Sequence, residues 1–315
     1  MPTDLLSIVI PVYRNDQGLQ ALVGRIESAL KDWIDLDKLE LILVDDGSPD
    51  NSWAVISDLV KVQPWIVGIK LRRNFGQHNA IMAGLTHAHG SLIVLMDDDL
   101  QHSPMDIPKI VALLNQQFDV VYAQFYTKHH ALWKIIGSKL NNFIAVYLLD
   151  KPKNLYFSPF KGLRSEIRDE LIKYSGPFVY LDGLIMAITQ NIGVVRVEHH
   201  PRSVGESGYS VHKSISLWLK MATLYSVWPL RIAGLIGFIL AFGGVLLALY
   251  LILGQLFSNG PTPPGWTSLI VVSLLLGGGQ LIFLGVIGEY LGRSYTFLNH
   301  KPQYIIEHIQ LAKPE

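Results

Sequence analysis

The sequence contains no cysteine, and this absence excludes disulfide bonds, thiolate metal ligands and a cysteine nucleophile. It also lacks an excess of charge of either sign, because 26 Lys and Arg residues balance 26 Asp and Glu residues. Bulk electrostatic attraction therefore does not favour nucleic acid as a partner, and none is expected. Apolar residues are abundant instead, at 50% of the 315 residues, and they are unevenly spread along the chain.

Short β-rich segments alternate with longer segments of helical periodicity between residues 5 and 125. This alternation predicts βαβ units, and hence an α/β fold with a mainly parallel sheet and helices on both faces. No Gly-x-Gly-x-x-Gly motif follows the first strand, so a dinucleotide-binding fold of the usual kind is not expected. The predicted strands are Leu5–Ile10, Leu39–Val44, Ile66–Leu71, Ser91–Met96, Val120–Ala123 and Gly193–Glu198, and the predicted helices are Gly18–Lys31, Asn51–Lys61, Gln77–Ala88 and Met105–Gln116.

Acidic side chains follow two of these strands at the point where each strand ends. Asp45 and Asp46 follow one strand, and Asp97, Asp98 and Asp99 follow another. Ligands of open α/β sheets bind beyond the carboxyl ends of the strands, and clustered carboxylates repel one another unless a cation or substrate compensates them. Hard oxygen ligands at this density suit Mg²⁺ or Mn²⁺. The pattern predicts one acidic pocket able to hold a metal and a sugar nucleotide, with a solvated acidic turn as the alternative.

The three consecutive acids are not equivalent. By the alternation of side chains along a strand, Asp97 and Asp99 share one side and Asp98 points to the other. Asp98 is therefore expected to serve either a ribose or only the local turn. The paired arginines that follow the third strand, Arg72 and Arg73, suit bidentate phosphate recognition, and a solvated surface pair is the alternative.

Two long apolar segments lie in the last third of the chain. Leu230–Phe257 has no charge after Arg231, and Trp266–Ile287 has none at all. Each exceeds the length of about 20 residues that crosses a bilayer, so two transmembrane helices are predicted, with a buried helical hairpin as the alternative. Basic residues flank both outer ends, and the positive-inside rule then assigns both flanks to the cytoplasm. These flanking residues are Lys213, Lys220 and Arg231 on one side and Arg293 and Lys301 on the other.

Five motifs occur in a fixed order along the chain: Ser7–Tyr13, Asp45–Ser48, Arg73–Gln77, Asp97–Gln101 and Gly288–Arg293. Together with the apolar helix pair, this ordered set resembles the polyprenyl-phosphate glycosyltransferases. These are family-2 inverting enzymes that include dolichol-phosphate mannose synthase and undecaprenyl-phosphate glucosyltransferases. The resemblance spans nearly the whole chain and implies a GT-A fold, which is Rossmann-like, with interfacial helices and a C-terminal two-helix transmembrane hairpin.

The resemblance also implies residue roles. Pro11, Tyr13 and Asp46 would contact the base and ribose of the donor nucleotide, expected to be uridine, and Asp98 and Arg73 are further candidates for nucleotide binding. Asp97 and Asp99 would hold Mg²⁺ or Mn²⁺ on the diphosphate, with Asp99 also counted as catalytic, and Gln101 would lie beside the donor sugar. Arg202 and Ser207 would belong to a mobile loop near the phosphates.

One segment departs from the family pattern. Many relatives carry an acid, proposed as the catalytic base, where this chain has Phe157–Gly162. A phosphate monoester is already largely ionised at neutral pH, so the acceptor needs positioning more than proton removal. Lys161 is expected to help hold the acceptor phosphate. Asp182 is the remaining candidate for a base or a sugar-hydroxyl contact, and a helix N-cap is its alternative.

The sequence therefore predicts a metal-dependent enzyme that moves a hexose from a UDP-sugar to undecaprenyl phosphate with inversion, in the modification of cell-envelope polysaccharide or lipopolysaccharide. Two alternatives stay open. One is a glycosyltransferase with a non-polyprenyl acceptor. The other is a catalytically silent membrane scaffold or nucleotide-sugar-binding partner protein.

The expected domains are a cytoplasmic catalytic domain (1–210), an interfacial amphipathic helix (211–229), two transmembrane helices (230–292) and a cytoplasmic C-terminal tail (293–315). This organisation predicts a multi-pass protein of the inner (plasma) membrane with both termini in the cytoplasm. Gly277-Gly278-Gly279 permits close helix approach and is compatible with a homo-oligomer. The apolar segment 128–157 is expected either to lie on the membrane surface or to pack on the sheet.

Overall fold

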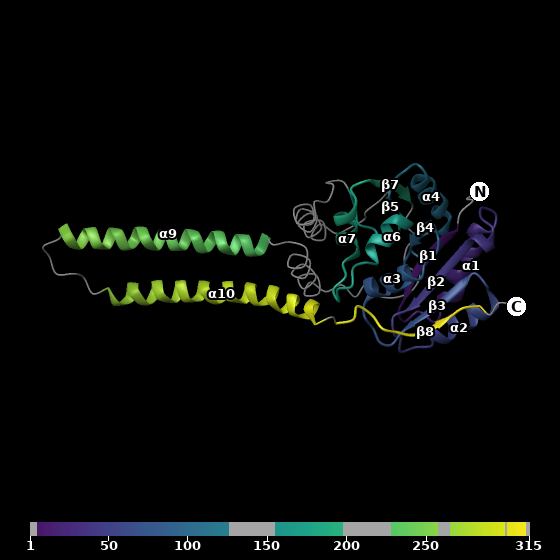
Figure 1. The fold of residues 1–315 in the computed structure, drawn as a ribbon, viewed down its shortest axis with the longest axis horizontal. Coiled ribbons are helices and arrows are strands. Elements are labelled where there is room, and N and C mark those ends of the chain that lie inside the picture. Colours follow the sequence, from purple (N-terminus) through teal and green to yellow (C-terminus); the bar gives the residue numbers. More distant parts are fainter. Residues whose placement is uncertain (1–4, 126–154, 198–227, 258–264, 300, 313–315) are drawn as a thin grey trace. The chain divides into compact units, whose positions relative to one another are not determined.

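The computed structural model describes residues 5–125, 155–197, 228–257, 265–299 and 301–312. It divides into two units, one made of residues 1–209 and 300–315 and the other of residues 210–299. The first unit is an α/β domain, and the second contains two long helices (Figure 1). The second unit is therefore inserted, along the sequence, between two parts of the first.

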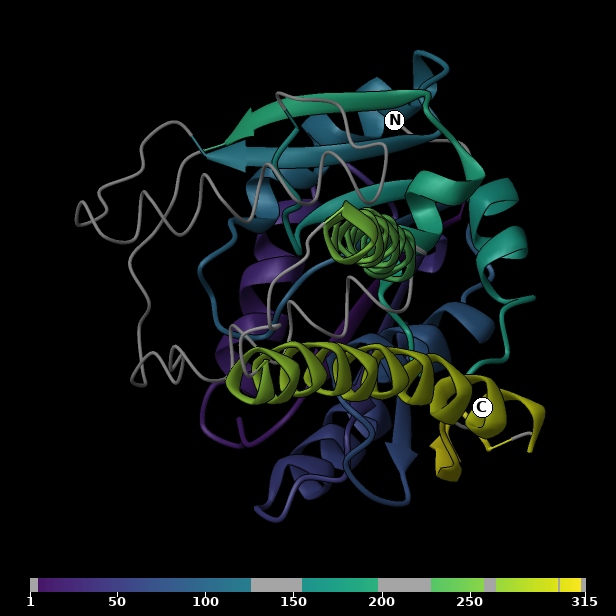
Figure 2. The same ribbon diagram turned by 90° about the vertical axis from the view of Figure 1, so that its left-hand side faces the viewer.

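The α/β unit is built on an eight-stranded sheet with the order β7-β5-β6-β4-β1-β2-β3-β8. The four central strands β4, β1, β2 and β3 are parallel, whereas β6 runs antiparallel to both β4 and β5, and β8 runs antiparallel to β3. Figure 2 shows β5 and β7 side by side at one edge of the sheet. The strand bounds are β1 Leu6–Val12, β2 Leu39–Asp45, β3 Ile66–Leu71, β4 Leu92–Leu95, β5 Val120–Phe125, β6 Lys161–Arg164, β7 Ile192–Val197 and β8 Ile306–Gln310.

Helices cover both faces of this sheet because its central strands are apolar on both sides. In β1 all seven residues are buried, with Ile8 and Ile10 in one hydrophobic cluster and Val9 in the other. Helices α1, α2 and α4 contribute to the first cluster, and α3, α6 and α7 to the second. The predicted mainly parallel sheet with helices on both faces is confirmed. The helix bounds are α1 Leu19–Leu30, α2 Ser52–Val62, α3 Gln77–Thr86, α4 Ile107–Asn115, α6 Ser165–Leu171 and α7 Leu181–Ile188, with 3₁₀ turns η1 Leu36–Lys38 and η2 Pro104–Asp106.

The C-terminal end of the chain returns to the sheet. Within the segment that we predicted as a tail, β8 pairs with β3 from Gly68 opposite Gln310 to Leu71 opposite Ile306. A salt bridge between Lys70 and Glu307, with 3.3 Å between the charged atoms, reinforces this pairing. The strand carries several polar side chains, and its partner lies more than two hundred residues earlier, so no local pattern in the sequence indicates it. Residues 300–315 consequently belong to the α/β unit.

The described residues of the second unit form α9 (Trp228–Phe257) and α10 (Trp266–Leu298), which lie side by side and antiparallel (Figure 1). Large apolar side chains are exposed on both helices, among them Phe238 on α9 and Leu281 on α10. Within the described residues, we find no helix whose length and apolar character suffice to cross a membrane. The two transmembrane helices stay a prediction. The predicted interfacial helix 211–229 and the apolar segment 128–157 lie almost wholly outside the described residues.

Candidate active site

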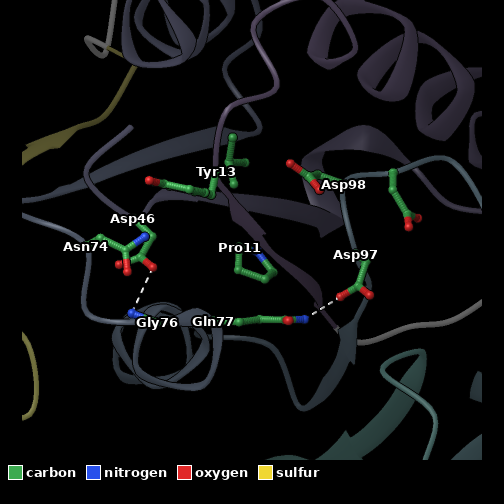
Figure 3. A pocket seen from close by; sticks show the side chains of 10 residues that line it. Pro11, Tyr13, Asp46, Asn74, Gly76, Gln77, Asp97 and Asp98 are labelled. Carbon is green, nitrogen blue, oxygen red and sulfur yellow. Dashed lines mark hydrogen bonds between the residues drawn. The ribbon is translucent and has the colours of Figure 1, made fainter. Parts of the chain in front are cut away.

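An acidic pocket lies at the carboxyl ends of three neighbouring strands. β1 lies between β2 and β4 in the sheet, so the residues that follow these strands meet at one edge. Figure 3 shows Pro11 in the middle of the pocket, with Asp46 and Asn74 on one side and Asp97 on the other. The cavity has a volume of about 270 Å³. Its lining consists of Pro11, Val12, Tyr13, Asp46, Asn74, Gly76, Gln77, Asp97, Asp98 and Asp99.

Asp46 organises one wall of this pocket. Its two carboxylate oxygens accept hydrogen bonds from the backbone N–H groups of Phe75 (2.7 Å) and Gly76 (2.9 Å). Gly76 is the N-cap of α3, so the carboxylate also faces the positive end of a helix dipole. Burial raises the pKa of Asp46, and the two backbone hydrogen bonds oppose that rise. A carboxylate oxygen can accept more than one hydrogen bond, so Asp46 retains capacity for a ligand.

The turn after Asp46 requires glycine. Gly47 has φ +63°, and a Cβ atom there would lie 2.4 Å from the carbonyl carbon of Arg73. Only a residue without a side chain adopts this backbone and permits this approach without strain. The preceding carboxylate, Asp45, closes the turn by accepting the Ser48 N–H at 3.1 Å. The Asp-Asp-Gly-Ser motif therefore brings the β2 end and the Arg73–Gly76 segment together.

The acids after β4 accept hydrogen bonds from neutral groups. The side-chain amide of Gln77 donates to Asp97 at 2.7 Å, as Figure 3 shows, and the Gln101 N–H donates to Asp99 at 3.1 Å. Asp98 lines the same cavity, although strand alternation placed it on the opposite side. Burial raises its pKa to about 6, and the charge of Asp99 acts in the same direction. One oxygen of Asp98, Oδ2, is buried and has no hydrogen-bond partner in the described part of the chain.

Backbone strain is concentrated beside the pocket. Arg14 follows Tyr13 with φ +56°, and Leu100 follows Asp99 with φ +61°. Left-handed conformations cost about 1–3 kcal/mol at residues other than glycine and cluster at functional sites. The chain therefore turns sharply at two of the strand ends that deliver pocket residues. β4 ends at Leu95, so Asp97–Asp99 lie beyond the strand and simple strand alternation does not describe Asp98.

The acidic pocket fits a hard divalent cation that shares its ligands with a substrate. No group of three or more His, Cys, Asp or Glu side chains in the described part of the chain is arranged to hold a metal. Magnesium, however, is usually bound by one or two carboxylates together with substrate phosphates. Asp97 and Asp99 would supply two such carboxylates from one cavity. Burial and the neighbouring charge of Asp99 raise the pKa of Asp98, although hydrogen bonds from Asn15 and the Tyr13 backbone oppose that rise, so a positive ligand would favour its ionised form.

Lys161 and Asp182 lie apart from the lining of this cavity and contact each other. They form a buried ion pair, and the hydroxyl of Tyr122 donates to Asp182 at 2.9 Å. Lys161 is aligned with Leu95 of β4, two residues before Asp97, so the pair begins on the strand next to the acidic turn. Asp182 is the second residue of α7, whose N-cap is Tyr180. The alternative of an N-cap at Asp182 is therefore wrong.

The remaining residues predicted for the site do not line the cavity in the described part of the chain. Arg73 is exposed, and its guanidinium lies 4.3 Å from the centroid of the Phe75 ring. Gln101 contributes its backbone N–H to Asp99 and does not line the cavity. Arg202 and Ser207 lie outside the described residues. Gln77, by contrast, lines the cavity, although the sequence assigned it no role. Its place in the Arg73–Gln77 motif and its hydrogen-bonding amide could have indicated a site residue.

These features define a glycosyltransferase. The family described as Glycosyl transferase family 2 matches residues 7–172, which is more than half of the chain. The chain belongs to this family, and the predicted membership is confirmed. Among curated relatives, the undecaprenyl-phosphate 4-deoxy-4-formamido-L-arabinose transferase of Pseudomonas savastanoi pv. phaseolicola is 33% identical over 100% of this chain and 93% of its own length. The enzyme of the same name from Pseudomonas syringae pv. syringae is 34% identical over 98% and 91%.

Solved structures show the same fold at low sequence identity. Glucosyl-3-phosphoglycerate synthase from Mycobacterium tuberculosis, in complex with Mn²⁺, UDP-glucose and phosphoglyceric acid, superposes with a TM-score of 0.52 at 14% identity. That match covers 70% of this chain and 78% of the other. Its complex with UDP gives a TM-score of 0.51, again at 14% identity, and covers 70% and 80%. The α/β unit is thus GT-A-like.

Proposed function

We propose that this protein transfers a sugar from a UDP-sugar to undecaprenyl phosphate, a polyprenyl phosphate, with inversion at the anomeric carbon. The observation that carries this proposal is the cavity at the ends of β1, β2 and β4, into which Asp97 and Asp99 bring two carboxylates. The names of the two Pseudomonas relatives, which match nearly the whole chain, support the acceptor.

The order of residues along the sheet supports one orientation of the donor. Tyr13, Pro11 and Asp46 line the part of the cavity over β1 and β2, where the nucleoside would bind. Asp97 and Asp99 follow β4, where the diphosphate and a Mg²⁺ or Mn²⁺ ion would lie. The mycobacterial enzyme with this fold was crystallised with Mn²⁺ and UDP-glucose, which supports the same pairing of metal and donor.

The chemistry requires positioning more than acid–base catalysis. A phosphate oxygen of the acceptor would form a bond to the anomeric carbon while the bond from that carbon to the diphosphate breaks, and UDP would leave. The acceptor phosphate is mostly ionised at neutral pH, so no protein base is needed to activate it. When bound, the divalent cation would neutralise charge that develops on the departing diphosphate. Gln77 would hold Asp97 in the orientation that this binding requires.

A lipid acceptor implies that the reaction occurs at a membrane. The proposal places the second unit in the inner membrane as a helical hairpin, with the catalytic domain on the cytoplasmic side. The uncharged stretches after Arg231 and between Trp266 and Ile287 support this placement, as do the exposed apolar side chains of both helices. The product would be a lipid-linked sugar for modification of the cell envelope.

The sugar itself is the least constrained part of the proposal. The sequence predicts a hexose, whereas the relatives are named for 4-deoxy-4-formamido-L-arabinose. Hydroxyl stereochemistry does not follow from residue types, so a screen of donors must include both classes. A second copy of the chain remains a proposed partner, because the glycine run at 277–279 permits close helix packing.

The test is a transfer assay with membranes that contain the full chain. Radiolabelled UDP-hexoses and UDP-4-deoxy-4-formamido-L-arabinose are each incubated with undecaprenyl phosphate and Mn²⁺, and label extracted into organic solvent is counted. We expect label with one donor, dependent on both acceptor and metal. Binding of UDP without organic-soluble label from any donor would instead favour the nucleotide-sugar-binding alternative. The variant Asp99→Asn should lose most of this label. Asp37→Asn, which alters an exposed acid in η1, is its matched control and should keep the label.

A further inference from the structure

Lys161 and Asp182 form an unusually buried ion pair. Their side chains are only 3% and 10% exposed, whereas those of Lys61 and Asp58 in a surface pair are 66% and 74% exposed. A charge removed from water is costly unless a partner and further hydrogen bonds compensate it. Here the two charges compensate each other, because Lys161 donates directly to a carboxylate oxygen of Asp182.

Tyr122 completes this cluster. It is fully buried in β5, and its hydroxyl donates to the same Asp182 oxygen that accepts from Lys161. The ammonium of Lys161 also lies 4.8 Å from the centroid of the Tyr122 ring, within reach of a cation–π interaction. The cluster joins β5, β6 and the first turn of α7. Its net charge is zero, so it offers little attraction to an incoming phosphate.

The cluster is connected to the acidic pocket through two neighbouring elements. In the sheet, Lys161 is aligned with Leu95, and Asp97 follows two residues later. In α3, Gln77 donates to Asp97 on one side, while the next residue, His78, packs edge-on against Tyr180 with 5.6 Å between ring centroids. Tyr180 is the N-cap of the helix that carries Asp182. The first turns of α3 and α7 therefore contact each other beside Asp97.

We propose that Lys161 and Asp182 act as one neutral positioning pair that fixes the first turns of α7 and α3 beside Asp97. Neither residue then acts separately on the substrate. This differs from the roles expected from the sequence, which were an acceptor-phosphate contact for Lys161 and a base or sugar contact for Asp182. The inference rests on the proposed function for its measurements of activity and of UDP affinity, and not for the unfolding temperature.

A double-substitution cycle in the full chain tests the pair. Lys161→Met or Asp182→Asn alone leaves one buried charge without its partner, whereas the combined variant removes both charges and keeps an acceptor for the Tyr122 hydroxyl. We expect each single variant to lower the unfolding temperature, the affinity for UDP and kcat/KM, the last by about tenfold or more. The combined variant should recover all three to within about threefold of wild type in affinity and rate.

A surface pair provides the matched control. Lys61→Met, Asp58→Asn and their combination should change each measurement little, because exposed pairs contribute little to stability. A combined Lys161→Met/Asp182→Asn variant that regains its unfolding temperature and UDP affinity but stays as inactive as Lys161→Met would show that Lys161 contacts substrate, and would overturn the proposal. A combined variant that fails to fold would overturn it equally.

The outcome is separable from that of the proposed function. If the wild type transfers no sugar to undecaprenyl phosphate, the proposed function fails. The unfolding temperature still decides whether the two charges act as a pair, because it does not depend on the identity of the donor nucleotide, the sugar or the acceptor.

Discussion

Two polar sites lie on adjacent strands at the same edge of the sheet, and they balance charge differently. In the acidic pocket, the side-chain amide of Gln77 donates to Asp97 and the Gln101 N–H donates to Asp99, and one buried oxygen of Asp98 has no hydrogen-bond partner among the described residues. In the cluster on β6 and α7, the carboxylate of Asp182 is met by the ammonium of Lys161. The first site brings three carboxylates into one cavity, and burial raises the pKa of Asp98 there, whereas the second site is an ion pair of zero net charge.

The difference separates a site prepared for a ligand from one that supports the fold. Carboxylates that repel one another in a cavity lower the stability of the empty protein and favour a cation or a substrate with its metal. A buried ion pair whose two charges already compensate each other does not favour binding of a further cation. Substitutions that neutralise a single carboxylate should therefore have opposite effects on stability in the two sites.

The largest expected effect is on activity in the acidic pocket. Asp99→Asn removes one of the two carboxylates proposed to hold the metal while keeping an oxygen that accepts the Gln101 N–H. Loss of one preorganised electrostatic contact typically lowers the rate by about 10²–10³-fold, and we expect a decrease of that size in transfer. The assay is initial rate against Mn²⁺ concentration, with unfolding temperature as the control for folding. A rate within twofold of wild type at all Mn²⁺ concentrations would refute the metal assignment.

The next effect is on stability in the neutral cluster. Tyr122→Phe removes the hydroxyl that donates to Asp182 at 2.9 Å inside the protein. Hydrogen bonds to charged groups contribute about 1.5–3 kcal/mol, so the free energy of unfolding should fall by that amount in urea denaturation. Tyr174→Phe is the matched control, because its hydroxyl donates to the Phe178 carbonyl at an exposed position. Equal losses in both variants would mean that the cluster has no special stabilising role.

A smaller effect of opposite sign is expected for Asp98→Asn. Burial raises the folded-state pKa of Asp98 from 3.8 to about 6, so its ionisation, which is nearly complete at pH 7.5, costs more free energy in the folded protein than in the unfolded chain. The stability that this group contributes is present below pH 3.8 and is lost as the pH rises through 6. The variant should exceed wild type by about 1–2 kcal/mol at pH 7.5, allowing for partial exposure, and this gain should vanish near pH 4.

Urea denaturation at the two pH values measures this difference. Asp58→Asn, at an exposed position, gives the background change for loss of a surface carboxylate. If Asp98→Asn were less stable than wild type at pH 7.5, the folded protein would stabilise the ionised carboxylate of Asp98. The contrast between the two sites would then be wrong.

The smallest effect concerns His78, between the two sites. Burial lowers its pKa, and the charge of Lys161 adds to this whereas that of Asp182 opposes it. A His with a lowered folded-state pKa contributes stability above 6.5 that is lost as the pH falls below 6.5 toward the folded value. In His78→Asn, the change in the free energy of unfolding between pH 7.5 and pH 5 should be smaller than in wild type, by less than about 1 kcal/mol. An unchanged slope would show that burial does not lower the pKa of His78.

Most of the fold and half of the site were predictable from local patterns. Continuous apolar runs indicated β1, β2 and β3 within two residues of their observed bounds, because buried parallel strands need apolar residues on both faces. The convergence of Pro11, Asp46 and Asp97 followed from the rule that parallel strands end at one edge. The antiparallel strands β6 and β8 were not predicted. Both are short and polar, and both pair with strands that are distant in the sequence.

By itself, the sequence determined the class of protein, because its five motifs in fixed order resemble the family-2 glycosyltransferases and the family match covers residues 7–172. Motifs of this kind are short stretches of sequence and can be read without the fold. Only the tertiary structure decided how charges are partnered. It placed Asp98 in the pocket, beyond the end of β4 at Leu95, and joined Lys161 to Asp182 across twenty residues of chain. Pairing of charges depends on distances in space, and residue types along a sequence do not carry that information.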